Sequence, residues 1–286
     1  MNPLFEVFDG GDFILSSYRD VEEPLAEMRV YLDPAGGGAA LVPAAKAALK
    51  AALDIVGVET PITVGEIADE DWQLAYRRHF KTEPIGEHLL SVPEWEVESA
   101  KAQWADSGRR MIVLDPGMAF GTGKHETTRA CLEYLDEIVS AAGDPAGLSV
   151  LDMGSGSGIL SIAAAKLGCG RVVGFDVDQE AVDASAENAA KNEVGVEYFR
   201  YALGRADAAK GDARLDRRYD LVLANILGPL LIRFADEIVP VVGSRLVLSG
   251  ILSELYPEVR AAYVSRGLRE VSSKTFGEWT TGLYEI

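Results

Sequence analysis

The sequence predicts an α/β fold with a mostly parallel sheet covered by helices on both faces. From about Arg110 to the C-terminus, short apolar runs of strand type alternate with longer segments of helical periodicity. Such alternation is typical of parallel sheets, because a parallel connection needs a crossover that is usually a helix. Two final runs, 268–275 and 280–285, follow each other closely, which predicts a terminal antiparallel strand pair.

The elements of this large domain, residues 109–286, follow from the length and period of each apolar run. The expected strands are 111–114, 149–153, 171–175, 197–201, 221–224, 245–249, 268–275 and 280–285. The expected helices are 127–141, 159–167, 179–191, 229–239 and 253–266. The charged segment 204–218, rich in Gly and Ala, predicts a loop.

Residues 1–66 predict a small N-terminal α/β domain. Its expected elements are strands at 13–17 and 28–32, a glycine loop at 33–38 and an Ala-rich helix at 43–55. Residues 67–108 predict a linker with a helix from Asp69 to Phe80 and a short strand at 88–92. We expect the aromatic side chains of this linker to pack against the large domain; the alternative is that they form a wall of a substrate cleft.

Composition narrows the possible partners and compartments. The 286 residues carry a formal charge of −18, which disfavours direct binding to nucleic acid or anionic lipid and suits a basic partner. The only cysteines, Cys131 and Cys169, lack metal-binding spacing, so we expect no metal site and a reducing, cytoplasmic location. No apolar stretch reaches membrane-spanning length, and the N-terminus does not read as a signal peptide.

The most informative motif is a glycine turn between a strand and a helix. Residues 150–158 read Val-Leu-Asp-Met-Gly-Ser-Gly-Ser-Gly, and a helical pattern begins at Ile159. Glycines at Gly154 and Gly156 allow backbone N–H groups to approach a ligand closely, since no Cβ stands in the way. The next strand ends in Asp176, whose carboxylate is placed to accept hydrogen bonds from two ribose hydroxyls.

The details of this turn favour S-adenosylmethionine over a dinucleotide. A dinucleotide fingerprint has the form Gly-x-Gly-x-x-Gly, whereas here the third glycine comes one residue early, at Gly158. Asp152, two residues before the turn, disfavours a pyrophosphate but tolerates a sulfonium-bearing amino acid with its ammonium group. A nicotinamide cofactor and a tight turn without a ligand remain the alternatives.

A second glycine-rich segment, Asp115-Pro-Gly-Met-Ala-Phe-Gly-Thr-Gly-Lys-His-Glu-Thr-Thr, ends at Thr128. It is not a phosphate loop, because His125 follows the lysine where Ser or Thr is needed. We expect Phe120, Gly121 and the Thr128 hydroxyl to contact the methionine end of the cofactor. The alternative is a loop that only caps the following helix.

Asn225 follows the strand 221–224 and is the candidate catalytic residue. Methyl transfer to an amine needs a nitrogen lone pair aimed at the methyl carbon, so the rate acceleration comes from positioning and desolvation. The Asn225 carbonyl can accept an N–H of the amine and orient it. Burial beside a sulfonium lowers the amine pKa from about 10.4, so a dedicated base is not required. His125 is a further candidate as a proton shuttle.

At these residues the chain resembles the PrmA-type ribosomal-protein methyltransferases. The similarity lies in the segment 115–128, the turn at 152–158 and Asn225-Ile-Leu, and also in Asp71-Trp72 and Glu278-Trp279. It covers roughly residues 69–286. The resemblance implies a class I, Rossmann-like methyltransferase fold and methylation of lysine or N-terminal amines on large-subunit ribosomal protein eleven.

The resemblance also assigns site residues and roles to the domains. The implied cofactor contacts are Thr128, Gly154, Asp176 and Asn225, and the small N-terminal domain would recognise the ribosomal protein. Two features depart from the family: the N-terminal domain looks shortened, and Gly228 stands where alanine is usual. The alternatives are a methyltransferase for another protein or a small amine, a nicotinamide oxidoreductase, and a non-catalytic binding module. We expect a monomer.

Overall fold

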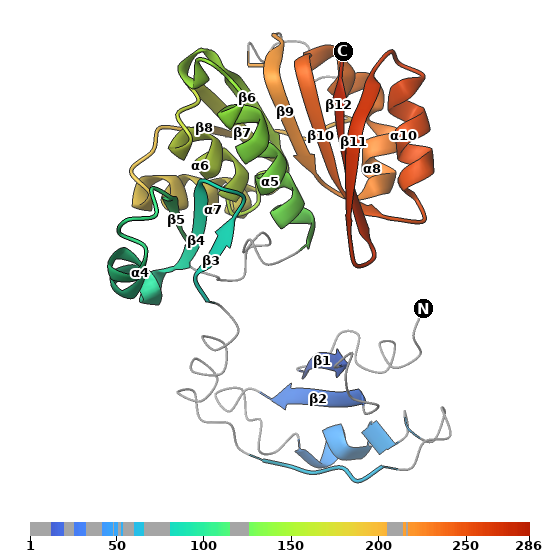
Figure 1. Ribbon diagram of the computed structural model, residues 1–286. Helices are drawn as coiled ribbons and strands as arrows, with labels where there is room; N and C mark the ends of the chain where they lie inside the picture. Colours follow the sequence, from blue (N-terminus) through green and yellow to red (C-terminus); the bar gives the residue numbers. More distant parts are fainter. Residues whose placement is uncertain are drawn as a thin grey trace. The chain divides into compact units, whose positions relative to one another are not determined.

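The computed structural model describes residues 13–19, 26–32, 42–47, 49–50, 53, 60–65, 81–114, 126–204, 214–215 and 217–286. The predicted helix at 69–80 and the loop at 115–125 lie outside these residues. The chain divides into two compact units, Met1–Trp72 and Gln73–Ile286, which are described separately (Figure 1). No described helix is long and apolar enough to cross a membrane.

The first unit contains an antiparallel strand pair. β1 (Phe13–Arg19) and β2 (Ala26–Leu32) pair with Phe13 opposite Leu32. The expected strands at 13–17 and 28–32 are confirmed, each with two additional residues. Residues 42–47 and 49–50 are helical, within and just before the Ala-rich segment expected to form a helix.

The second unit is built on a seven-stranded sheet in the order β11-β12-β10-β9-β6-β7-β8. Its strands are β6 (Ser149–Met153), β7 (Arg171–Asp176), β8 (Glu197–Arg200), β9 (Tyr219–Asn225), β10 (Val242–Leu252), β11 (Arg269–Phe276) and β12 (Trp279–Glu285). The pairs from β10 through β9, β6 and β7 to β8 are parallel, whereas β12 pairs antiparallel with both β10 and β11. The α/β fold and its terminal antiparallel strands are confirmed.

Helices cover both faces of this sheet (Figure 1). On one face lie α5 (Glu126–Ser140), α6 (Ile159–Lys166) and α7 (Gln179–Lys191). On the other lie α8 (Gly228–Arg233), α9 (Ala235–Ile238) and α10 (Tyr256–Val264). Short 3-10 turns occur at Glu94–Glu96, Pro145–Gly147 and Val239–Val241.

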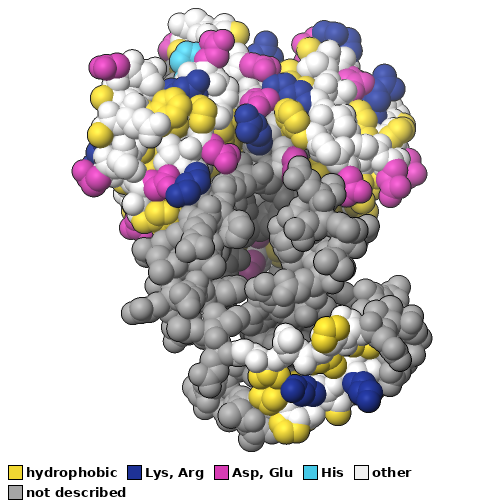
Figure 2. Space-filling model, turned by 60° about the horizontal axis from the view of Figure 1, so that its bottom comes forward, with side chains coloured by type: hydrophobic (Ala, Val, Ile, Leu, Met, Phe, Trp, Pro, Cys, Tyr) yellow, Lys and Arg dark blue, Asp and Glu magenta, His cyan; other side chains and the backbone are white. Residues whose placement is uncertain are grey.

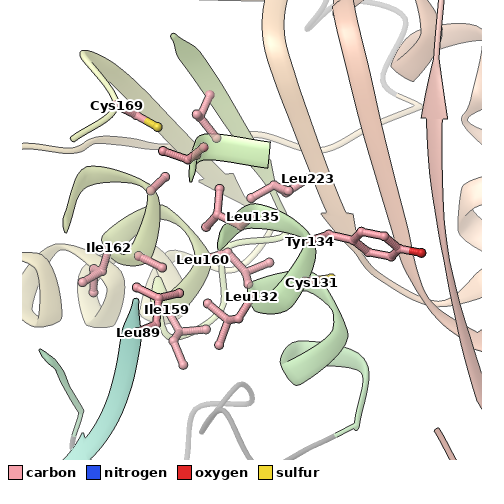
Figure 3. Packing of buried hydrophobic residues seen from close by; sticks show 14 of the residues in the cluster. Leu89, Cys131, Leu132, Tyr134, Leu135, Ile159, Leu160, Ile162, Cys169 and Leu223 are labelled. Atoms are coloured by element: carbon pink, nitrogen blue, oxygen red, sulfur yellow. The ribbon is translucent and has the colours of Figure 1, made fainter. Parts of the chain in front are cut away.

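The buried strand residues explain why the sheet needs two helical layers. Along β9, Leu221 and Leu223 belong to the cluster under α5 and α6, whereas Val222 belongs to the cluster under α8 and α10. Successive side chains of a strand point to opposite faces, so a continuous apolar run requires cover on both. Figure 3 shows the first cluster, in which Leu132 and Leu135 of α5 lie near Leu160 of α6.

One expected strand of the main sheet belongs elsewhere. β5 (Arg110–Leu114) pairs with β4 (Leu89–Pro93), and β4 pairs with β3 (Glu83–Ile85), in a separate three-stranded sheet. α4 (Val97–Gln103) lies between β4 and β5 in the chain. β5 is also held by Asn192, whose side chain accepts from Val113 N at 2.8 Å and donates to Val113 O at 2.7 Å. The length and hydrophobicity of a strand do not specify the strand with which it pairs, which is why β5 was wrongly expected in the main sheet.

Two helix boundaries also differ from expectation. The helix expected at 229–239 is interrupted at Phe234, the residue between α8 and α9. The helix expected from 253 begins at Tyr256, because Ser253 N donates to Glu278 O at 2.8 Å and Leu255 N closes a turn onto Leu252 O. Pro257 then occupies the first turn, where it needs no hydrogen-bond donor.

Candidate cofactor and acceptor site

The glycine turn between β6 and α6 has the conformation that its sequence requires. Gly154, Gly156 and Gly158 have φ values of +75°, +55° and +80°, in the left-handed region that favours glycine. The N–H groups of Gly154 and Ser155 donate to Phe175 O at 2.8 and 2.9 Å. These bonds fix the turn to the end of β7, the strand that carries Asp176.

Asp176 lies at the carboxyl end of β7 and joins the turn directly. Its Oδ2 accepts from Gly156 N at 3.0 Å, and its Oδ1 accepts from Asp178 N at 3.1 Å. The side chain is half-buried. Because a carboxylate has about four acceptor positions, two remain for other donors. The structure thus brings Gly154, Gly156 and Asp176 together at one edge of the sheet, where open α/β sheets bind ligands.

Asp152 lies beneath the turn and is fully buried. One carboxylate oxygen contacts the Ser161 hydroxyl and accepts from Ser161 N at 3.2 Å. The other oxygen has no hydrogen-bond partner among the described residues. Burial raises the pKa of Asp152 from 3.8 to about 6, against the lowering effect of the Ser161 bonds. The carboxylate therefore connects the turn to the first part of α6.

Asn225 and Thr128 meet on the other side of the turn. The Asn225 Nδ2 donates to Thr128 Oγ1 at 3.3 Å, across 97 residues of sequence. Thr128 is buried in the first turn of α5, and Asn225 is half-buried at the end of β9. The amide nitrogen of Asn225 is bonded to Thr128, whereas its amide oxygen accepts no hydrogen bond from the described residues and is available to an N–H of an amine.

The loop after Asn225 packs on the glycine turn. A Cβ built on Gly154 would lie 2.6 Å from the Ile226 Cγ2, closer than side chains approach one another. An alanine at this position would require the Ile226 side chain to shift. The residues expected to bind the cofactor therefore lie next to the residue expected to orient the acceptor.

Not every predicted site residue can be placed. Phe120, Gly121 and His125 lie outside the described residues. Thr128, Gly154, Gly156, Asp176 and Asn225 are described, and all lie at or immediately after the ends of β6, β7 and β9 or in the adjoining turn of α5. Within the described ranges, no cluster of three His, Cys, Asp or Glu side chains has the arrangement to hold a metal ion.

Sequence reasoning missed Ser249, which lies beside Asn225 in the sheet. Ser249 pairs in register with Asn225, is fully buried, and contacts α5 through a 3.2 Å bond from its hydroxyl to Thr127 O. A polar residue directly after the apolar run Leu246–Leu248 was the available signal. Asn225 was selected by the same signal.

The side chain of Leu255 occupies the space beside Gly228. A Cβ on Gly228 would lie 2.7 Å from Leu255 Cδ2, the flexible end of a side chain. Leu255 thus occupies the space that an alanine methyl would need. An alanine at this position would therefore require the end of the Leu255 side chain to shift.

Comparison with known proteins agrees with this geometry. The family model "Ribosomal protein L11 methyltransferase (PrmA)" matches residues 38–284. A ribosomal protein L11 methyltransferase of Geobacter sulfurreducens is 40% identical over 264 residues, covering 91% of this chain and 81% of the relative. One of Geobacter metallireducens is 43% identical over 227 residues, covering 79% of this chain and 69% of the relative.

A solved structure supports the same assignment. The ribosomal protein L11 methylase of Lactobacillus delbrueckii subsp. bulgaricus superposes with a TM-score of 0.61 and 30% identity, covering 72% of this chain and 98% of that one. The family match spans the glycine turn, Asp176 and Asn225, the residues of the candidate site. This chain therefore belongs to the ribosomal protein L11 methyltransferase (PrmA) family.

Proposed function

We propose that this protein transfers methyl groups from S-adenosylmethionine to lysine or N-terminal amines of ribosomal protein L11. The observation that carries the proposal is the contact between Ile226 and Gly154, which joins a nucleoside-type turn to Asn225. The family membership and the relatives' activity support the reaction and its substrate.

The residues of the turn fit S-adenosylmethionine, the methyl donor of this class of enzyme. The left-handed glycines open the backbone to a ligand, and Asp176 retains acceptor positions for ribose hydroxyls. Thr128 and Asn225 lie beside this turn and would hold the methionine end. When bound, the cofactor supplies an activated methyl group on a positively charged sulfur.

The chain's own contribution is to orient and desolvate the acceptor amine. The Asn225 amide nitrogen is held by Thr128, so its oxygen is fixed in direction and accepts an N–H of the incoming amine. A lysine amine must lose a proton before it reacts, and desolvation lowers its pKa from about 10.4. The site is apolar beside Asn225, where Ile226 is half-buried and Leu227 is 63% exposed.

Charge and domain organisation agree with a basic protein substrate. The formal charge of −18 suits a lysine-rich partner and disfavours direct nucleic-acid binding. Figure 2 shows acidic and basic side chains intermixed on one face of the second unit, so the negative charge is not gathered into one patch there. We propose that residues 1–66 recognise the substrate, that 67–108 link the domains, and that 109–286 catalyse the transfer.

Location and assembly are part of the same proposal. Cys131 and Cys169 are buried free thiols, as expected for a cytoplasmic protein that acts on a ribosomal component. The enzyme acts as a monomer, which sedimentation of the purified protein checks.

Intact-mass spectrometry tests the proposed function. Purified protein is incubated with S-adenosylmethionine and recombinant ribosomal protein L11, with the Asp176→Ala and Asn225→Ala variants in parallel. We expect methylated L11 with the wild-type enzyme and strongly reduced methylation with both variants. Binding of the cofactor without methylation of L11, but with methylation of another protein in a ribosome-depleted extract, would instead support a different substrate.

A further inference from the structure

β10 contains an irregularity beside the candidate acceptor site. Leu248 pairs with Gly282 of β12 and Ile251 pairs with Thr280, so Ser249 and Gly250 together face the single residue Thr281. Two residues opposite one define a β-bulge, which bends a strand and redirects its side chains. Bulges are enriched next to active sites, and this one lies in register with Asn225 of β9.

The first residue of the bulge binds the helix that carries Thr128. The Ser249 hydroxyl donates to Thr127 O at 3.2 Å and lies 2.6 Å from the Thr281 hydroxyl, from which it can accept. All three residues are buried. Strand alternation places Ser249 on the same face as Val247, which packs in the cluster under α5, and the bulge shifts the following residues so that Ile251 faces the other helical layer with Leu248.

The second residue of the bulge makes room for the loop after Asn225. Gly250 has a φ of +79°, and a Cβ there would overlap the backbone carbonyl of Ile226. An obstructing backbone atom cannot move aside as a side-chain end can. Gly250 therefore allows the Ile226 backbone to lie directly against β10, while Ile226 Cγ2 reaches the glycine turn at Gly154.

We propose that the β10 bulge is a positioning device for methyl transfer, in which Ser249 and Gly250 together set the orientation of Asn225. Ser249 fixes the turn of α5 whose Thr128 receives the Asn225 amide, and Gly250 fixes the backbone that follows Asn225. Neither residue needs to touch the substrate. The inference rests on the proposed function, because it assumes that Asn225 orients the acceptor amine.

A double-mutant cycle tests this role. Ser249→Ala removes the hydroxyl, and we expect kcat to fall by about tenfold to a hundredfold, since small misplacements of reacting groups have effects on this order. The Kd for S-adenosylmethionine should change by less than about threefold. In an Asn225→Ala background, Ser249→Ala should no longer lower kcat, whereas its effect on the melting temperature should persist.

A matched control separates positioning from stability. Ser149 lies at the opposite end of the sheet, where its hydroxyl donates to Asp220 Oδ2 at 2.6 Å. Ser149→Ala therefore removes a strand hydroxyl and its bond to a neighbouring strand, and we expect a lower melting temperature with unchanged kcat. Gly250→Ala is paired with Gly267→Ala, which has a φ of +95° but no atom within 4 Å of the added Cβ.

The outcomes distinguish this inference from the proposed function. If Asn225→Ala alone leaves kcat unchanged, the role proposed for Asn225 fails. If Asn225→Ala lowers kcat but Ser249→Ala lowers it equally in both backgrounds, or not at all, the positioning role of the bulge is overturned while the proposed function stands. Should Gly250→Ala fail to fold, the Ser249 cycle decides the question.

Discussion

Replacing Gly154 by alanine should weaken cofactor binding without greatly disturbing the rest of the fold. Gly154 has a φ of +75°, and its missing Cβ leaves space for the Ile226 Cγ2, which would otherwise lie 2.6 Å away. The substitution therefore strains the turn and separates it from the loop that carries Asn225. Both changes act at the centre of the proposed site.

The magnitude follows from the two effects. A left-handed conformation costs a non-glycine residue about 1–2 kcal/mol. Moving the Ile226 methyl from 2.6 Å to an ordinary contact requires a displacement of roughly 1 Å, which costs about 1 kcal/mol in a close-packed site. If the altered turn must regain its shape when the cofactor binds, about 2–3 kcal/mol of affinity is lost, which is roughly thirtyfold to 150-fold in Kd.

Isothermal titration calorimetry with S-adenosylmethionine measures this change. Gly108→Ala is the control, because Gly108 has a φ of +68° but nothing within 4 Å of the added Cβ. We expect Gly108→Ala to keep the wild-type Kd, since it carries the conformational strain alone and lies outside the site. A Gly154→Ala protein with wild-type affinity would refute the argument that this turn cradles the cofactor.

Three further predictions concern single side chains. Asp176→Ala should raise the Kd for S-adenosylmethionine by about one to two orders of magnitude, the loss of two hydrogen bonds to a charged acceptor, and calorimetry showing equal affinity would exclude the ribose role. Asn225→Ala should lower kcat far more than cofactor affinity, and equal methylation rates would remove Asn225 from the site. For Asp152, the folded state binds the proton more tightly than the unfolded state, because burial raises its pKa from 3.8 to about 6. The ionised carboxylate therefore costs stability that grows as the pH rises from about 4 to above 6. Asp152→Asn, compared with wild type by urea unfolding, should gain relative stability over this range, by roughly 3 kcal/mol at most; a difference independent of pH would contradict the assignment.

Much of the second unit follows from local sequence patterns. β6 and α7 have the predicted bounds, and the glycine turn and Asp176 occur where the strand ends placed them. These features depend on periodicity and on glycines at fixed offsets, which short-range physics determines. The convergence of Thr128 and Asn225 was also predictable, because the carboxyl ends of parallel strands share one edge of the sheet.

The remaining features depend on contacts that the sequence does not encode locally. β5 pairs with β4 in a separate small sheet, and hydrophobicity alone does not specify which strands pair. From the sequence, Asp152 was interpreted only as a carboxylate close to the ligand-binding turn, whereas in the structure this carboxylate is bonded to Ser161. The role of Ser249 requires knowledge of the bulge, which appears only when the registers of β9, β10 and β12 are compared.

The most direct test of the central claim is a crystal structure of this protein with S-adenosylmethionine bound. The account predicts the ribose hydroxyls against the Asp176 carboxylate, the backbone of Gly154 and Gly156 along the ligand, and the methyl group facing Asn225. A cofactor bound elsewhere, or a sugar that does not contact Asp176, would contradict it.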